Sequence, residues 1–210
     1  MVTITCNKGG KKYNKEWIFR GMDFCIQPGN PTVVTGFNGS GKSTLLQCVS
    51  GSSLLTEGNI VFSFNDSIIV AEKHFAYCSL VAPYLDIVEE MTATEFLNFH
   101  QHFKPFYTAI TTADALAMAG LLKAANKQIR YFSSGMKQRI KLLQAVLSDV
   151  PLLLLDEPCT NLDDEGVALY HSLVDAYGKQ KTILVASNNK IEYSFCTQQL
   201  NIMQFKPGYQ

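Results

Sequence analysis

The segment Gly36-Phe37-Asn38-Gly39-Ser40-Gly41-Lys42-Ser43 constrains the fold more than any other part of this sequence. It matches the pattern G-x-x-x-x-G-K-[ST]. An apolar run typical of a strand, Thr32–Thr35, precedes it, and Thr44–Val49 reads as a helix. The three glycines let successive main-chain N–H groups turn inward around a phosphate, and the helix N-terminus adds a partial positive charge. The sequence therefore predicts a phosphate-binding loop within an α/β fold.

This loop predicts a nucleoside triphosphate as the ligand, with ATP and Mg²⁺ as the expected cofactors. Lys42 would place an ammonium near the β- and γ-phosphate oxygens and is also a candidate catalytic residue, and the Ser43 hydroxyl would bind Mg²⁺. The residues expected to bind the nucleotide are Gly36, Asn38, Gly39, Ser40, Gly41, Lys42, Ser43 and Thr44.

Two carboxylates follow the apolar run Leu152–Leu155, which is typical of a strand buried on both faces. In phosphate-loop enzymes the acid that closes such a strand holds Mg²⁺, so Asp156 is a candidate metal ligand. Glu157 is then placed to polarise a water aimed at the γ-phosphorus, as a catalytic residue. The alternative is a strand that leaves the core through a polar turn at Pro158. Beside an intact phosphate-binding loop, the catalytic interpretation is favoured.

Composition indicates a packed globular chain without a strong charge bias. Hydrophobic residues make up 47% of the 210 residues, and 18 basic residues balance 18 acidic ones, which gives no electrostatic reason to expect nucleic acid. The six cysteines include no C-x-x-C pair, so neither a zinc site nor a disulfide scaffold is expected. The apolar stretch Val150–Leu155 is far shorter than the ~20 residues that span a bilayer. We therefore expect a soluble chain.

Strand and helix signals alternate at both ends of the chain. A capping box, Thr92–Glu95, opens one expected helix with Phe96, Phe99 and Phe103 on one face; a second runs from about 112 to 120, and a third opens at Ser133. The expected strands are Thr3–Cys6, Trp17–Phe19, Met22–Ile26, Thr32–Thr35, Ile60–Phe64, Ser67–Val70, Phe75–Cys78, Leu152–Leu155, Thr182–Ala186 and Leu200–Phe205. This order predicts an α/β core with a helical insert.

The run Phe132-Ser133-Ser134-Gly135-Met136-Lys137-Gln138-Arg139 resembles the signature motif, usually L-S-G-G-Q, of ATP-binding-cassette (ABC) ATPases. The run from Asp156 to Asp163 is similar to the Walker B motif and D-loop of that family. Tyr13 lies where the family has an aromatic that stacks on adenine, with Trp17 as the other candidate. The match extends over nearly the whole chain in the family's order.

The resemblance implies one ABC-type ATPase domain over residues 1–210. It implies a P-loop NTPase core with a largely parallel central sheet and an antiparallel N-terminal β subdomain (about 1–91 and 149–210), and a helical signature subdomain (about 92–148). Ser133, Ser134 and Gly135 would contact the γ-phosphate of ATP bound to a second copy, giving a head-to-tail, ATP-dependent homodimer. ATP hydrolysis would power a separate integral membrane permease subunit. The chain would be cytoplasmic and peripheral to the inner face of the cell membrane.

Two family residues are missing. A Gln usually follows the strand near Cys78, but Ser79 or Leu80 stands there; a switch His usually follows Thr182–Ala186, but Asn188 occupies that position. The Asn188 amide can donate a hydrogen bond to the γ-phosphate, as a candidate catalytic residue, but cannot carry a proton. We expect slow but real turnover. The alternative is an ATP-dependent regulatory clamp with little turnover.

Leu80–Val88 is unusually apolar for a loop and corresponds to the region where the family docks its membrane subunit. The alternative is that these side chains pack against the helical insert. A soluble relative acting on ribosomes or DNA is disfavoured because the chain is short and single and has zero net charge. A small-molecule kinase is disfavoured because it has no use for a signature segment.

Overall fold

The computed structural model describes residues 1–65 and 67–208, which form two compact units. The first, here called the core unit, comprises Met1–Leu80, Pro151–Asp156 and Gln180–Gln210. The second, here called the helical unit, comprises Val81–Val150 and Glu157–Lys179. The assignment of the whole chain to one ATPase domain stays a prediction.

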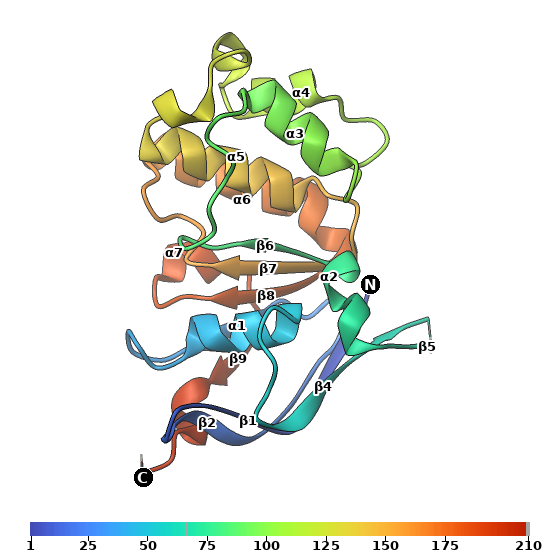
Figure 1. The fold of residues 1–210 in the computed structure, drawn as a ribbon, viewed down its shortest axis with the longest axis vertical. Helices are drawn as coiled ribbons and strands as arrows, with labels where there is room; N and C mark the ends of the chain where they lie inside the picture. The colour runs from blue at the N-terminus through green and yellow to red at the C-terminus, as the bar shows by residue number, and fades with distance from the viewer. Residues whose placement is uncertain (66, 209–210) are drawn as a thin grey trace. The chain divides into compact units, whose positions relative to one another are not determined.

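A five-stranded sheet forms the centre of the core unit (Figure 1). The strand pairs β3–β8, β3–β9 and β7–β8 are parallel. Every residue of β7 and β8 is buried, as their continuous apolar sequences predict for strands covered on both faces. In spatial order the strands are β6 (Cys78–Val81), β7 (Leu152–Asp156), β8 (Thr182–Ala186), β3 (Thr32–Thr35) and β9 (Gln198–Asn201). The largely parallel central sheet is therefore confirmed.

The second sheet of the core unit is antiparallel, as expected for the N-terminal region. Along the start of its strand β1, alternate residues such as Ile4 and Cys6 are buried, which is the pattern of a half-exposed strand. The two expected runs from Trp17 to Ile26 belong to one continuous strand. In spatial order the strands are β2 (Glu16–Ile26), β1 (Thr3–Tyr13), β4 (Glu57–Phe64) and β5 (Ser67–Ile69).

Helix α1 (Lys42–Ser50) lies between the two sheets (Figure 1). Its residues Leu45, Leu46 and Val49 are fully buried. They share one apolar cluster with Phe62 of the antiparallel sheet and Leu154 of the parallel sheet. The helix that follows the phosphate-binding loop is thus fixed from both sides, and the loop is held at the end of β3.

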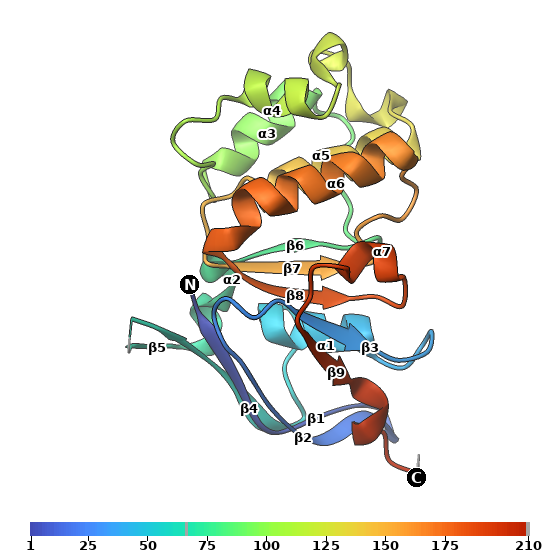
Figure 2. The same ribbon diagram turned by 180° about the vertical axis from the view of Figure 1, so that it is seen from behind.

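The helical unit consists of four helices, with α5 and α6 side by side in both views (Figures 1 and 2). Capping boxes at Thr92 and Thr111 open the first two helices; the first was predicted from the sequence. Of the three phenylalanines expected on one face, Phe96 is buried, whereas Phe99 and Phe103 are 47% and 71% exposed. The helices are α3 (Ala93–Gln101), α4 (Thr112–Met118), α5 (Ser134–Val146) and α6 (Asp164–Tyr177). Short 3-10 turns are η2 (Leu122–Ala124), η3 (Ile129–Tyr131) and η4 (Gly178–Gln180).

Two expected strands were wrong in part. Phe75–Cys78 is mostly helical: α2 (His74–Tyr77) continues from the 3-10 turn η1 (Ala71–Lys73), and the strand begins only at Cys78. This run of four apolar residues is short enough to fit one helical turn equally well. Leu200–Phe205 ends its strand at Asn201, whose side chain accepts a hydrogen bond from the Met203 N–H and starts the 3-10 turn η5 (Ile202–Phe205).

The last helix of the core unit is the single turn α7 (Lys190–Tyr193), which follows β8. Across the described residues, no helix combines the length and apolar character that crossing a bilayer requires.

Candidate nucleotide site

The phosphate-binding loop has a backbone that only glycine accommodates at its key positions. Gly36, Gly39 and Gly41 have φ angles of 155°, 77° and 107°. A Cβ atom at Gly41 would lie 2.2 Å from Cγ2 of Ile18, and one at Gly36 would lie 2.6 Å from Cγ2 of Ile202. The loop therefore needs glycine for its conformation and also for its close packing against the structure beneath it.

Lys42 is the first residue of α1 and is only 5% exposed. Its ammonium group donates hydrogen bonds to the main-chain oxygens of Gly36, at 2.8 Å, and Phe37, at 3.3 Å. The charge is thus folded back across the loop and is held there by main-chain oxygens. A cation in this place, next to the start of a helix, attracts an anion such as a phosphate.

A buried hydroxyl in the same loop points to a ligand. The Ser40 Oγ atom has no hydrogen-bond partner among the described residues, although Ser40 is only 1% exposed. Leaving a buried polar group unpaired costs about 1–3 kcal/mol, so such a group calls for an explanation. In addition, Gly41 precedes α1 without any side-chain cap. The N–H groups of the first helical turn lack a side-chain acceptor, which suits an incoming phosphate oxygen.

The two predicted acids stand at the end of β7. Asp156 is the last residue of the strand and is 1% exposed. Glu157 adopts a left-handed backbone with φ of 43°, and its carbonyl accepts a hydrogen bond of 3.1 Å from the Thr160 N–H. A non-glycine residue in this conformation costs energy, and such residues are common at functional sites. The chain thus turns sharply at the acidic pair.

The oxygen donors of the core unit fit a magnesium ion. Ser43 and Asp156 offer a hydroxyl and a carboxylate, which are the hard oxygen ligands that Mg²⁺ prefers. No cluster of three or more His, Cys, Asp and Glu residues suited to a metal occurs in the part of the chain that the structure describes. One or two protein oxygens completed by phosphates and water are the usual ligand set for Mg²⁺ bound with a nucleotide.

Of the two candidate adenine-stacking residues, Tyr13 has the more accessible ring. It is 47% exposed at the end of β1, with the Lys11 Nζ atom 4.8 Å from its ring centre. Trp17 is half-buried, with the Arg20 Cζ atom 4.5 Å and the Lys12 Nζ atom 5.2 Å from its ring centre. Since two cationic side chains already lie over Trp17, Tyr13 is the better candidate for stacking.

Asn188, at the position of the switch His, contacts the phosphate-binding loop directly. Its side-chain oxygen accepts a hydrogen bond of 3.4 Å from the Gly36 N–H. Its side-chain nitrogen donates one of 3.3 Å to the Asn38 side-chain oxygen. Ser79, near the position of the missing Gln, is buried in β6 and donates to the Leu152 main-chain oxygen. The Ser79 hydroxyl therefore makes a contact between two strands of the parallel sheet.

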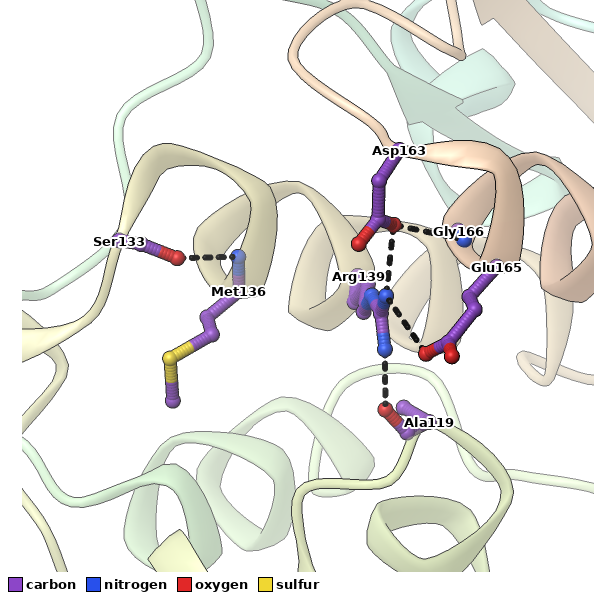
Figure 3. A network of polar contacts seen from close by, with 7 residues as sticks. All are labelled: Ala119, Ser133, Met136, Arg139, Asp163, Glu165 and Gly166. Atoms are coloured by element: carbon purple, nitrogen blue, oxygen red, sulfur yellow. Dashed lines mark hydrogen bonds and ion pairs between the residues drawn. The ribbon is translucent and has the colours of Figure 1, made fainter.

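In the helical unit, Ser133 and Ser134 are exposed at the start of α5. The Ser133 hydroxyl oxygen accepts a hydrogen bond of 3.2 Å from the Met136 N–H and caps the helix (Figure 3). The helix that the sequence predicts to open at Ser133 is therefore present. The next residue, Gly135, approaches the chain after β7: a Cβ atom at Gly135 would lie 3.0 Å from the Asn161 main-chain oxygen.

Two side chains of α5 also hold the segment between Glu157 and α6. The Gln138 amide, 3% exposed, donates a hydrogen bond of 2.7 Å to the Pro158 main-chain oxygen. Arg139 lies 2.7 Å from the carboxylate of Asp163 and 3.3 Å from the Ala119 main-chain oxygen (Figure 3). The same Asp163 oxygen caps α6 by accepting from the Gly166 N–H. The hydrogen bond from Arg139 lowers the pKa of the Asp163 carboxyl.

Sequence reasoning assigned no role to Gln138, Arg139 or Asp163. The available signal was helical spacing, since residues three and four positions after Gly135 share its face of α5. Their partners lie 20 and 24 residues away in sequence, and nothing in the sequence pairs them.

The apolar segment after β6 is partly held by α5. Val81 and Ala82 are fully buried, and the Lys141 ammonium donates to the main-chain oxygens of Ala82 and Pro83. Tyr84 and Val88 are each 43% exposed. Docking of a partner on this segment stays a prediction.

Comparisons with known proteins agree on one family. Residues 19–160 match the family model described as ABC transporter. The cytochrome c biogenesis ATP-binding export protein CcmA of Xylella fastidiosa (strain 9a5c) is 34% identical over 158 residues, which are 74% of this chain and 70% of that protein. ABC transporter I family member 1 of Arabidopsis thaliana is 31% identical over 84% of this chain and 77% of that protein.

Solved structures share the fold. A putative ABC transporter ATP-binding protein from Pyrococcus furiosus has a TM-score of 0.80 at 19% identity, over 97% of this chain and 99% of that chain. The dimeric structure of MJ0796, a bacterial ABC transporter cassette, has a TM-score of 0.79 at 21% identity, over 95% of this chain and 94% of that chain.

Proposed function

Because this chain belongs to the ABC transporter family, as an ATP-binding subunit, we propose that it hydrolyses ATP to drive a separate membrane-spanning partner. ABC ATP-binding domains are in general ATPases. The observation that carries the proposal is the phosphate-binding loop with its buried lysine: the Lys42 ammonium lies 2.8 Å from the Gly36 oxygen, within a backbone that has positive φ at three glycines.

In this proposal the loop residues Gly36, Asn38–Thr44 surround the phosphates. Tyr13 stacks on the adenine. Ser43 and Asp156 would hold Mg²⁺, which would supply positive charge against that of the phosphates. The unpaired hydroxyl of Ser40 and the uncapped start of α1 support this assignment, because both require acceptor oxygens.

Glu157 is the proposed catalytic base. It would orient a water molecule toward the γ-phosphorus and accept its proton, while the bond to the β-phosphate oxygen breaks and ADP leaves with that electron pair. The left-handed backbone at Glu157 supports the proposal, because strained residues of this kind are common where a side chain must be aimed. Asn188 stands in place of the family's switch His and cannot carry a proton. We expect turnover to be slow.

Two copies are proposed to bind head to tail around ATP. The exposed Ser133 and Ser134, with Gly135, present a hydroxyl, main-chain amides and the positive end of α5 to the γ-phosphate held by the other copy. The similarity of the fold to a cassette solved as a dimer is in keeping with this assembly. The partner would be an integral membrane permease, which would place the chain in the cytoplasm at the inner face of the membrane. No nucleic-acid partner is expected.

Phosphate release by the purified chain tests the enzymatic proposal. The wild type with Mg²⁺ and ATP is compared with Glu157→Gln, which keeps the shape of the side chain but cannot accept a proton. We expect release by the wild type to be at least about 100-fold faster, the usual contribution of a positioned base. Equal rates with intact ATP binding would overturn hydrolysis by Glu157 and support a clamp with little turnover.

A further inference from the structure

The turn that follows β8 is fixed on both sides of Asn188. The Ser187 N–H donates a hydrogen bond of 3.3 Å to the Val34 main-chain oxygen of β3. The Ser187 hydroxyl accepts from the Asn189 N–H and donates to the buried carboxylate of Glu192. The Asn189 side chain accepts from the Ile191 N–H and caps α7. The neighbours of Asn188 are therefore held in place within the core unit.

Asn188 uses this fixed base to reach two residues of the phosphate-binding loop. The amide oxygen accepts a hydrogen bond from the Gly36 N–H, and the amide nitrogen donates one to the Asn38 side-chain oxygen. On the other side of Gly36, its carbonyl accepts the Lys42 ammonium at 2.8 Å. Gly36 is thus held by Asn188 through its N–H and by Lys42 through its carbonyl.

The chemistry of these contacts requires an amide. One end of the side chain must accept a hydrogen bond and the other must donate one, and only Asn and Gln offer both without a charge or a change with pH. An Asp at this position would place a carboxylate oxygen opposite the Asn38 side-chain oxygen, so that two acceptors would face each other. A His would lose its acceptor on protonation.

We propose that Asn188 is a positioning residue for the phosphate-binding loop, which it holds in the nucleotide-ready conformation through Gly36 and Asn38. The proposal deepens the proposed function and rests on it. It differs from a direct role at the γ-phosphate in one testable respect: a residue that positions the loop matters equally for ATP and ADP, whereas a γ-phosphate donor matters for ATP alone.

Amide hydrogen exchange of the nucleotide-free protein tests the proposal without reference to activity. We expect the peptide covering residues 36–41 to exchange about tenfold faster in Asn188→Ala, because the Gly36 N–H loses its acceptor and the Asn38 side chain loses its donor. Asn189→Ala is the matched control: it alters the same turn and the same residue type but does not touch the loop, so its exchange at 36–41 stays at the wild-type rate. Unchanged exchange in Asn188→Ala would overturn the proposal.

Binding of MgATP and MgADP is then measured by calorimetry on the same proteins. We expect Asn188→Ala to weaken both nucleotides by the same factor, about three- to tenfold. Weakening of ATP alone would assign Asn188 to the γ-phosphate and overturn the positioning role, while the proposed nucleotide site would stand. Failure of the wild type to bind either nucleotide would overturn the proposed function.

A double-mutant cycle of Asn38→Ala and Asn188→Ala checks that the two amides act through each other. Because they share one hydrogen bond, the double variant should lose less ADP affinity than the product of the two single losses. A product equal to the double loss would contradict the pairing.

Discussion

The phosphate-binding loop of the core unit is shaped by its main chain, whereas the start of α5 in the helical unit is held by side-chain contacts. The loop is a main-chain structure: Gly36, Gly39 and Gly41 have φ angles of 155°, 77° and 107°, and Gly36 and Gly41 also pack too closely against Ile202 and Ile18 to admit a Cβ atom. The start of α5 is held by side chains, through a serine cap, a buried amide and an arginine.

This difference explains why one motif follows its family pattern strictly and the other does not. Main-chain geometry demands glycine at fixed spacing, and the loop sequence has it. Side-chain contacts tolerate replacement as long as donors and acceptors match, so Ser134 and Met136 can stand where the usual motif has Gly and Gln. The predictions below test this contrast.

The largest effect is expected at the single charged side chain of the loop. Lys42→Ala removes an ammonium that is 5% exposed and tied to two main-chain oxygens. Loss of charge-assisted contacts to the phosphates should weaken ATP binding by roughly 100-fold. Calorimetric titration with MgATP measures this, and Lys123→Ala on the helical unit is the control with unchanged affinity. Parent-like binding by Lys42→Ala would remove the basis of the nucleotide assignment.

Two glycines of the loop separate backbone strain from close packing. Gly39 and Gly41 both have positive φ, but an added Cβ meets nothing within 4 Å at Gly39 and lies 2.2 Å from Ile18 at Gly41. We expect Gly39→Ala to lower the free energy of unfolding by about 1 kcal/mol and Gly41→Ala by about 3 kcal/mol. Urea unfolding of the two variants provides the comparison. Equal losses would mean that packing beneath the loop is unimportant.

Most of the strands, helices and turns that follow a regular sequence pattern could be predicted from the sequence. The strand, loop and helix around Lys42, the buried strand before Asp156 and the capping box at Thr92 are all present. Local patterns of three or four residues were less reliable, since His74–Tyr77 formed a helical turn where the short apolar run Phe75–Cys78 suggested a strand. The contacts of Asn188 with Gly36 and of Arg139 with Asp163 join residues 152 and 24 positions apart, and only the folded chain brings them together.

The helical unit contains a half-buried histidine that makes its stability sensitive to pH. His100 at the end of α3 lies 2.8 Å from the hydroxyl of the fully buried Ser148. Burial lowers the pKa of His100 to about 4, with a smaller contribution from Lys104. In the unfolded chain the histidine pKa is about 6.5, so the unfolded chain binds a proton more readily than the folded one. The stability that neutral His100 contributes is therefore fully present above about pH 6.5 and is lost as the pH falls toward 4.

We therefore expect the free energy of unfolding to be about 2 kcal/mol lower at pH 5 than at pH 7.5 through this group. The measurement is urea unfolding of the wild type and of His100→Gln at both pH values, where the variant keeps a hydrogen-bonding side chain but does not titrate. The variant should lose less stability on acidification. An equal loss in both proteins would assign the effect to other groups, such as His74, whose pKa is also lowered by burial.

The smallest effect is expected at Arg139, and it should appear in turnover more than in binding. Arg139 holds the Asp163 carboxylate at 2.7 Å and so fixes the segment that follows Glu157, but the phosphate-binding loop lies in the other unit. Arg139→Met keeps the apolar stem and removes the ion pair. We expect kcat for ATP hydrolysis to fall about three- to tenfold with little change in ATP affinity, because Glu157 would be aimed less well.

Arg139→Lys and Asp163→Asn separate positioning from general loss of stability. The lysine can restore one hydrogen bond to Asp163 and should recover part of the lost kcat, whereas a residue needed only for folding would show equal thermal destabilisation and turnover loss in both variants. Asn at 163 can still cap α6 but no longer offers a charge to Arg139. If Arg139→Met reduces ATP affinity as strongly as kcat, the helical unit influences the phosphate-binding loop itself. In that case the loop, built from main chain, would not serve binding alone, and the side-chain contacts of α5 would not serve turnover alone.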